Sequence, residues 1–156
     1  MNGIASKSLE ISFKCLFCCC FLNFFFTYRM YLLVLFLADI CQAYQPLIDG
    51  GRKHDFVTVS RNCDHQLSGW YRFKEAAGTK MVTKCPPKYR CDADYPVWLD
   101  GGHPTVAEGK VSRRGCIHKH DCCDPVVFIQ VKNCSSHYIY KLSNLRDCNA
   151  RFCTTD

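Results

Sequence analysis

Cysteine content constrains the fold of this chain more than any other feature of its 156 residues, of which 14 are cysteines. This density, about 9% of the chain, is typical of small secreted domains that are held together by disulfides. Four cysteines fall inside an apolar N-terminal segment, and the other ten are spread over the rest of the chain. An even set outside the cytosol predicts full pairing, and hence about five disulfides. The predicted half-cystines are Cys41, Cys63, Cys85, Cys91, Cys116, Cys122, Cys123, Cys134, Cys148 and Cys153.

The N-terminal segment indicates which compartment the chain enters. Lys7 and Lys14 precede a long apolar run that ends at the small residue Ala38, which is the pattern of a secretory signal peptide. Residues 15–38 are also long enough to cross a bilayer, which takes roughly 20 apolar residues, so an uncleaved signal-anchor is the alternative. A start at Met30 would instead leave a short apolar segment without a basic beginning. The signal peptide and the anchor both place the rest of the chain outside the cytosol, and both permit disulfides.

Cysteine parity favours one cleavage position over another. Cleavage after Ala43 would follow the small-residue rule but would leave nine cysteines. Cleavage after Ala38 keeps Cys41 and leaves an even set. We therefore predict a signal peptide, or an uncleaved signal-anchor, over residues 1–38, and a single secreted domain over residues 39–156. The domain would have a membrane attachment only if the leader is an uncleaved anchor.

The charge of the predicted domain excludes one class of partner. Three of the 20 Lys and Arg residues and one of the 14 Asp and Glu residues precede residue 39, so the remainder carries a net charge of +4. Charges of both signs are interspersed, and the only tight basic cluster is Arg113 with Arg114. This pattern lacks the basic stripe of nucleic-acid-binding proteins and indicates a solvated surface. We expect no nucleic-acid partner.

Short runs of β-branched and aromatic residues alternate with Pro, Gly and Asp in the predicted domain. This pattern predicts a small, disulfide-rich, mainly β domain with long ordered loops, the longest at 84–96 and 99–105. No segment has a sustained helical stripe, although residues 74–81 could form one turn that Gly78 ends. The expected strands are 55–60, 69–73, 109–113, 126–132 and 137–142.

The densest group of reactive side chains lies at residues 115–124, with the sequence GCIHKHDCCD. Its cysteines and histidines offer enough ligands for a four-coordinate zinc ion. Structural zinc sites, however, usually bring together two ligand pairs from separate loops, and secreted thiols are normally oxidised. We therefore assign no metal ligand and expect no cofactor. The side chains considered for zinc are Cys116, His118, His120, Cys122 and Cys123.

The same stretch is similar to the C-C-x-x-H-D-x-C helix of secreted phospholipases A2, in which the His activates water and the Asp helps to hold calcium. It matches that pattern at Cys116, His120, Asp121 and Cys123, but not at the second cysteine. Pro125 and a β-branched run follow at once, which disfavours the long helix. A glycine- and cysteine-rich calcium loop is missing upstream. Calcium-dependent hydrolysis by His120 and Asp121 is therefore the enzymatic alternative, and we assign no catalytic residue.

Disulfide chemistry is the remaining interpretation of this stretch. Neighbouring residues of an extended segment point to opposite faces. Cys122 and Cys123 are therefore expected to form two separate bridges to different parts of the fold. His118 and His120 would then be exposed loop residues.

Several spaced motifs, taken together, indicate a family. The segments CQAYQPLIDGGR (41–52), CDHQLSGWYRF (63–73) and PVWLDGGHP (96–104) are followed by the paired cysteines and by a closing CNARFC (148–153). Their order and spacing resemble the cysteine-rich domain family of uromodulin, pancreatic zymogen-granule glycoprotein-2 and oncoprotein-induced transcript-3. The resemblance covers nearly the whole predicted domain.

The motif residues also have local structural roles. Trp70, Tyr71 and Phe73 would supply large apolar area to a small core. Gly101 and Gly102 would permit a tight turn.

The resemblance implies a non-enzymatic protein. Known members are secreted or membrane-anchored glycoproteins, in which this domain usually stands beside growth-factor-like modules and a zona-pellucida polymerisation module. In uromodulin and glycoprotein-2 it is associated with N-glycans that capture mannose-binding bacterial fimbriae. The expectation for this chain is an extracellular recognition or structural module that binds glycoproteins or other extracellular proteins. A fragment of a larger mosaic glycoprotein is the alternative within that class.

The glycan acceptors of the family are replaced in this chain. Uromodulin-like members often carry sequons in W-L-N-G-[ST]-H-P and in Y-N-L-T. The corresponding positions here are Asp100, with Gly102 in the hydroxyl place, and Lys141. Asn133, in Asn-Cys-Ser, is the only sequon and is a candidate N-glycosylation site. The implied mannose-decoy role is therefore not expected to rest on the usual sites.

Overall fold

A computed structural model describes residues 39–57 and 59–156, so the predicted signal or anchor segment over residues 1–38 lies outside the described residues. Ile40–Asp156 form one structural unit. None of the helices within the described residues is long and apolar enough to span a membrane. The elements are β1 (Gln45–Leu47), η1 (Gly50–Arg52), β2 (Ser68–Phe73), η2 (Glu75–Ala77), β3 (Lys80–Met81), β4 (Tyr95–Asp100), β5 (Lys110–Ile117), β6 (Val126–Asn133), β7 (Tyr138–Ser143), β8 (Ala150–Phe152) and β9 (Thr154–Thr155), where η marks a 3-10 helix.

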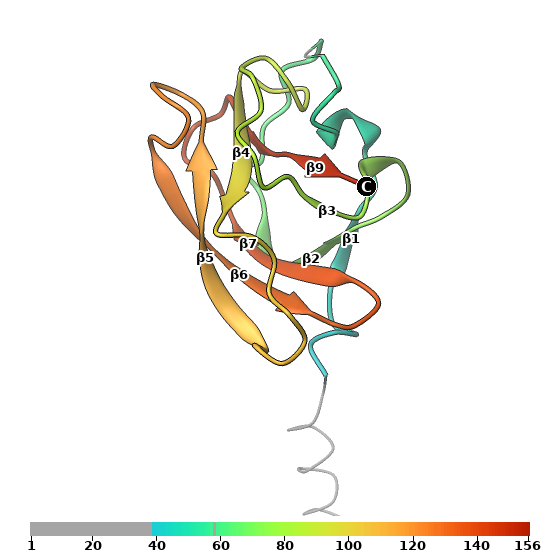
Figure 1. Ribbon diagram of the computed structural model, residues 1–156. Helices are drawn as coiled ribbons and strands as arrows, with labels where there is room; N and C mark the ends of the chain where they lie inside the picture. Colours follow the sequence, from blue (N-terminus) through green and yellow to red (C-terminus); the bar gives the residue numbers. More distant parts are fainter. Residues whose placement is uncertain (1–38, 58) are drawn as a thin grey trace, which may run out of the picture. The chain divides into compact units, whose positions relative to one another are not determined.

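In the described part of the chain, seven strands form one mixed sheet in the order β1-β2-β7-β6-β5-β4-β8 (Figure 1). Its centre is antiparallel, because β4 pairs with β5, β5 with β6 and β6 with β7, and β7 also pairs antiparallel with β2. At the two ends of the sheet, β1 runs parallel to β2 and β8 runs parallel to β4. A separate antiparallel pair joins β3 to β9 beside the C-terminus. The fold is therefore mainly β, as the sequence predicts.

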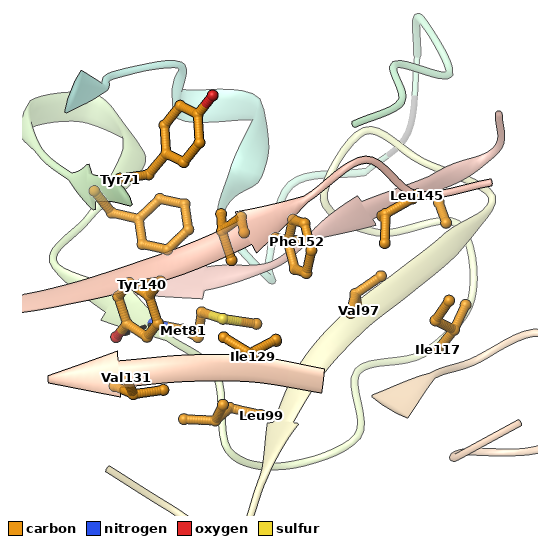
Figure 2. Packing of buried hydrophobic residues seen from close by; sticks show 13 residues of the cluster. Tyr71, Met81, Val97, Leu99, Ile117, Ile129, Val131, Tyr140, Leu145 and Phe152 are labelled. Atoms are coloured by element: carbon orange, nitrogen blue, oxygen red, sulfur yellow. Dashed lines mark hydrogen bonds between the residues drawn. The ribbon is translucent and has the colours of Figure 1, made fainter. Parts of the chain in front are cut away.

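The core lies on one face of this sheet, where alternate residues of each strand are apolar. Ile129 and Val131 of β6 are buried, whereas Phe128 is exposed, which is the period of two that a strand imposes. Figure 2 shows Ile129 and Val131 beside Leu99 of β4 and Met81 of β3. The buried cluster consists of Tyr71, Phe73, Met81, Val97, Leu99, Ile117, Ile129, Val131, Tyr140, Leu142, Leu145, Ala150 and Phe152.

Two aromatic motif residues enter the core as predicted, and the third does not. Tyr71 and Phe73 are buried, whereas Trp70 is only half-buried because it points to the other face of β2. The predicted glycine turn is confirmed, since Gly101 and Gly102 both have positive φ angles, of 90° and 74°.

The predicted strand at 55–60 is wrong. This segment makes only an isolated bridge between Val57 and Arg90. The N–H groups of Val59 and Ser60 donate to Oδ1 of Asp92, at 2.9 and 2.8 Å, instead of to a neighbouring strand. The apolar side chains here are solvent-exposed, so the pattern of β-branched residues has no sheet face to cover. The other four expected strands correspond to β2, β5, β6 and β7.

The sequence pattern also missed five strands. β4 begins at Tyr95 and includes Pro96, both inside the expected loop 84–96. β4 lies between β5 and β8, and its Val97 and Leu99 side chains are fully buried. Burial of these side chains therefore decides the conformation, although a proline usually indicates a loop or a sheet edge. The other four, β1, β3, β8 and β9, have two or three residues each, too few for a periodic signal. The single helical turn expected before Gly78 is present as η2.

Candidate functional site

Eight of the ten predicted half-cystines form four disulfides in the described chain. Three of these disulfides join residues 37 to 93 positions apart, and the fourth joins residues seven positions apart. Sequence alone could not give this pairing, because spacing does not determine connectivity. The pairs are Cys41–Cys134, Cys85–Cys122, Cys91–Cys153 and Cys116–Cys123.

The two remaining cysteines, Cys63 and Cys148, lie side by side without a bond between them. Their Sγ atoms and a ring nitrogen of His65 all lie within 4.8 Å of one another. Burial, and then the neighbouring Cys148 thiol, raise the pKa of the Cys63 thiol above its ordinary value. The structure thus contains four bridges and a near pair where about five bridges were expected. The near pair stands where the fifth bridge would form.

The stretch 115–124 consists of the end of β5 and the loop to β6. Cys122 is bonded to Cys85, and Cys123 is bonded back to Cys116 at the end of β5. The prediction of two separate bridges from the paired cysteines is therefore confirmed, although the pair lies in a turn and not in an extended segment. These four sulfurs are consumed as disulfides, which removes the thiolates that a zinc site at this stretch would need.

The histidines of this loop have different environments. His120 is exposed, as predicted, and Asp121 beside it uses Oδ1 to accept the N–H of Cys123 at 2.7 Å. The prediction for His118 is wrong, because this ring is half-buried with Nδ1 2.8 Å from the carbonyl oxygen of Pro86. Residues 118–125 form a loop, so the long helix of the phospholipase alternative is not formed.

The candidate glycosylation site occupies the end of β6. The half-buried Asn133 donates from Nδ2 to the carbonyl oxygen of Pro104 at 3.0 Å, and its Oδ1 accepts the N–H of Ser135 at 2.9 Å. The intervening Cys134 is bonded to Cys41. Both ends of the acceptor amide therefore help to hold the β6–β7 turn in the folded domain.

Basic side chains gather around a hollow of about 280 Å³ between the β2–β3 segment and the β6–β7 turn. Arg72, Lys74 and Lys80 line it, and Glu75 contributes the single carboxylate of its lining. In the described chain, no ion pair joins any of these four side chains to another group. We call this hollow the cationic pocket. Its remaining lining residues are Phe73, Thr79, Asn133, Ser135, Ser136, His137 and Tyr138.

One base of the cationic pocket is held in place from outside it. Arg72 donates from a terminal nitrogen to the hydroxyl of Tyr44 at 2.9 Å, and its guanidinium carbon lies 5.6 Å from the centre of the Tyr44 ring. Sequence reasoning missed this pocket, because its residues come from β2, η2, β3 and the β6–β7 turn. The three bases lie close together within residues 72–80, but the sequence does not show that the β6–β7 turn faces them, so only the tertiary fold forms the hollow.

A second, larger hollow of about 890 Å³ runs along the first half of β6 and faces the segment before β8. Its apolar wall includes Phe128 and Val126, which are 75% and 39% exposed. A Lys119–Asp147 ion pair contributes polar groups to the lining. We call this feature the apolar groove. Sequence periodicity places Phe128 on a strand, but it could not show that the rest of the described chain leaves this side chain exposed.

Comparison with known proteins identifies the family. Residues 71–154 match the model of the uromodulin-like domain, which is more than half of the chain. Pancreatic secretory granule membrane major glycoprotein GP2 of Canis lupus familiaris is 41% identical over 118 residues, covering 74% of this chain and 23% of that protein. Uromodulin of Mus musculus is 42% identical over 118 residues, covering 74% of this chain and 18% of that protein.

The human relative agrees with these two. Pancreatic secretory granule membrane major glycoprotein GP2 of Homo sapiens is 36% identical over 118 residues, covering 74% of this chain and 22% of that protein. The chain thus spans about a fifth of the length of the curated relatives that it matches. The motif spacing, the disulfide-bonded β fold and these matches agree. The chain belongs to the uromodulin-like domain family, and it is an extracellular, cysteine-rich domain.

Proposed function

We propose that this domain is a non-enzymatic recognition module that binds glycoproteins or other extracellular proteins. The observation that carries the proposal is the apolar groove, in which the aromatic ring of Phe128 is 75% exposed beside Val126. Exposed apolar side chains that form one continuous surface often belong to a binding site, whereas single exposed apolar residues are common on any protein surface. Exposed aromatic residues of this kind commonly supply much of the binding energy at protein interfaces.

Polar groups surround the apolar groove on the same face of the sheet. Phe128 of β6 lies opposite Arg114 of β5. The next row on this face contains Ser112 of β5, Gln130 of β6 and Lys141 of β7. An apolar centre with a polar rim is the usual composition of a protein interface. The antiparallel strands and the four disulfides hold this surface in one conformation. Such preorganisation lowers the entropy that binding costs.

The geometry of the β5–β6 loop supports a non-enzymatic role over hydrolysis. Asp121 turns its carboxylate to the backbone of its own loop, and His120 is exposed to solvent. We expect the purified, oxidised protein to release no fatty acid from phospholipid vesicles in the presence of calcium. Calcium-dependent turnover that disappears in His120→Ala would establish the phospholipase alternative instead.

The domain boundaries form part of the same proposal. We infer that residues 1–38 are removed as a signal peptide and that residues 39–156 form the mature domain. If the leader is retained as an anchor over residues 15–38, the domain still faces the extracellular side. Mass spectrometry of the secreted protein would give the N-terminus, and a chain that begins before residue 15 and stays with the membrane fraction would contradict cleavage.

The binding proposal is tested with a matched pair of variants. The fluorescently labelled protein is titrated onto intact mammalian cells. Phe128→Ser should weaken saturable surface binding about tenfold, since truncating an interface aromatic typically removes at least that much affinity. Val59→Ser is the control, because Val59 is 79% exposed on a different segment. Equal affinities for Phe128→Ser and the unmodified protein, or no saturable binding at all, would refute the proposal.

A further inference from the structure

We propose that the cationic pocket binds the terminal, carboxylate-bearing sugar of an extracellular glycan, of the sialic acid type. This inference rests on the proposed extracellular recognition role and assigns to it a ligand class and a second surface. It is independent of the apolar groove, because the two hollows share no lining residue.

The charge of the pocket selects an anion. Arg72, Lys74 and Lys80 bring three basic side chains to one hollow, against the single carboxylate of Glu75. Like charges gathered around a concave surface raise the local potential and attract an oppositely charged group. Because the described chain offers these bases no ion-pair partner, a bound anion would relieve their mutual repulsion.

The geometry of Arg72 favours a carboxylate. Its guanidinium is planar and presents paired donors that match the two oxygens of a carboxylate. One terminal nitrogen donates to the Tyr44 hydroxyl, and the guanidinium carbon lies 5.6 Å from the centre of the Tyr44 ring, within cation–π distance. The other terminal nitrogen and Nε are left for a ligand, since the hydrogen bond to Tyr44 is the one that this side chain donates within the described chain. Tyr44 is therefore a positioning residue.

The rest of the lining favours a sugar over a peptide or a lipid. Hydroxyl groups from Thr79, Ser135 and Ser136 both donate and accept hydrogen bonds, as the hydroxyl groups of a sugar do. Tyr138 adds an aromatic ring. The hollow of about 280 Å³ is just smaller than the range of about 300–1,000 Å³ that is usual for small-molecule sites. This volume suits a single terminal sugar ring better than an extended chain.

The direct test is a calorimetric titration of the full chain with 3′-sialyllactose, and with lactose as the neutral counterpart. The protein is secreted into the bacterial periplasm, which forms disulfides but adds no N-glycan at Asn133. We expect saturable binding of sialyllactose and none of lactose. Equal binding of the two sugars, or no binding of sialyllactose, would overturn the inference. Equally tight binding of lactose 3′-sulfate would also overturn it, because the site would then be a general anion site.

Variants locate the binding within the pocket. Arg72→Gln and, separately, Lys80→Gln should each weaken sialyllactose binding about tenfold, because each removes a charged donor to the ligand. Lys110→Gln is the control, since Lys110 is an exposed base outside the pocket that makes no ion pair in the described chain. Unfolding curves of the variants establish that they fold. Unchanged affinity in folded Arg72→Gln and Lys80→Gln would exclude the cationic pocket.

A double-mutant comparison of sialyllactose affinity tests whether Tyr44 acts by positioning Arg72. Tyr44→Phe should weaken binding in the otherwise unmodified protein, but should have no further effect when Arg72 is already glutamine. Such non-additivity is expected only if Tyr44 acts through Arg72. Additive losses would show that Tyr44 does not position Arg72 for the ligand.

Treatment of the cells with sialidase separates this inference from the proposed function. Loss of surface binding after the treatment, and in Arg72→Gln, would support the sialic acid assignment. Binding that survives both changes but is weakened by Phe128→Ser would overturn the assignment and leave the proposed recognition role standing. An absence of saturable binding to untreated cells would refute the recognition role. The sialyllactose titration would still show whether the cationic pocket binds a sialic acid.

Discussion

At the scale of single residues, two buried arginines illustrate how polar groups are accommodated in this small core. Arg52 makes two hydrogen bonds of 2.7 Å to the two oxygens of Asp64, and Asp64 also accepts the N–H of Phe152 at 2.9 Å. Arg151 pairs with Asp49, and Asp92 lies 4.0 Å away. A buried charge is tolerated only when its partners satisfy it. These pairs therefore join the chain before β2 to β8.

Breaking the first of these pairs should be strongly destabilising. Asp64→Ala leaves Arg52 buried without its counter-charge, which typically costs about 3–5 kcal/mol. Asp156→Asn is the matched control, because it removes a carboxylate from an exposed pair with Lys53 and should cost less than about 1 kcal/mol. Urea unfolding monitored by tryptophan fluorescence measures both free energies of unfolding. Similar losses in the two variants would argue against a structural role for the buried pair.

His103 should make the stability depend on pH. Burial, with a smaller contribution from the Lys80 charge, lowers the pKa of His103 from 6.5 to about 4, and its Nε2 lies 2.8 Å from the hydroxyl of Tyr140. The folded state therefore keeps this ring neutral, whereas the unfolded chain protonates it below pH 6.5. His103 contributes its full share of stability above pH 6.5 and loses it progressively as the pH falls toward 4.

The His103 contribution can be isolated by substitution. His103→Asn removes the titrating ring, so its melting temperature should fall less steeply than that of the unmodified protein between pH 6.5 and 4. Thermal unfolding at several pH values measures the two slopes. Identical slopes would show that other groups govern the acid sensitivity in this range.

At the scale of secondary-structure elements, η2 packs closely against the C-terminal strand. Gly78 ends η2 with a φ of 78°, and a Cβ atom there would lie 2.6 Å from the carbonyl oxygen of Thr155 in β9. Thr79 then donates its N–H to the same oxygen at 2.9 Å. The turn that leads into β3 therefore requires a residue without a side chain. This element, although short, fixes the register between β3 and β9.

Two glycine substitutions separate backbone strain from steric overlap. Gly78→Ala combines an unfavourable φ with overlap against backbone, and should destabilise the fold by about 2–4 kcal/mol. Gly102→Ala has a φ of 74° but open space around its Cβ position, so only a conformational cost of about 1 kcal/mol is expected. Chemical denaturation measures the free energy of unfolding of both variants, and the difference between them is the cost of the steric overlap. Equal losses would mean that β9 moves away at no cost.

At the scale of the whole molecule, disulfides join segments that are distant in the sequence. Cys41–Cys134 ties the start of the domain to the β6–β7 turn, and Cys91–Cys153 ties the loop before β4 to the C-terminal residues. Each such bridge stabilises the fold by about 2–4 kcal/mol, mainly by restricting the unfolded chain. A domain with this cross-linking resists complete unfolding outside the cell. The near pair of Cys63 and Cys148 would extend the framework to the segment before β2.

We expect Cys63 and Cys148 to be bonded in the secreted protein, which would complete the five bridges that parity predicts. Their sulfur atoms already lie within 4.8 Å of each other. Thiol titration of the denatured, secreted protein should find no free thiol, and Cys148→Ser should release one, at Cys63. Mass spectrometry of unreduced peptides would identify the bridge. Two free thiols in the unmodified protein, or zinc retained at these residues and His65, would contradict this expectation.

Local signals made much of the fold predictable from sequence. Period-two alternation located β2, β5, β6 and β7, and the position of Gly78 located the end of η2. The same signals failed where tertiary contacts decide the conformation. β4 includes a proline yet is largely buried. The run 55–60 has the pattern of a strand, but Val59 and Ser60 donate their N–H groups to Asp92. Short strands such as β8 exist only because a partner is present.

The sequence by itself determined the disulfide-rich β character and the family, because cysteine number, motif spacing and side-chain alternation are properties of the chain order. Tertiary structure alone decided which cysteines pair, since pairing depends on distance in space. It also decided where function can reside. Arg72 lies in β2, Lys74 just after it and Lys80 in β3, and the β6–β7 turn completes the cationic pocket. Phe128 is exposed because, within the described residues, no element covers it. Each surface combines a short local segment with residues that are distant in the sequence, so the fold completes both.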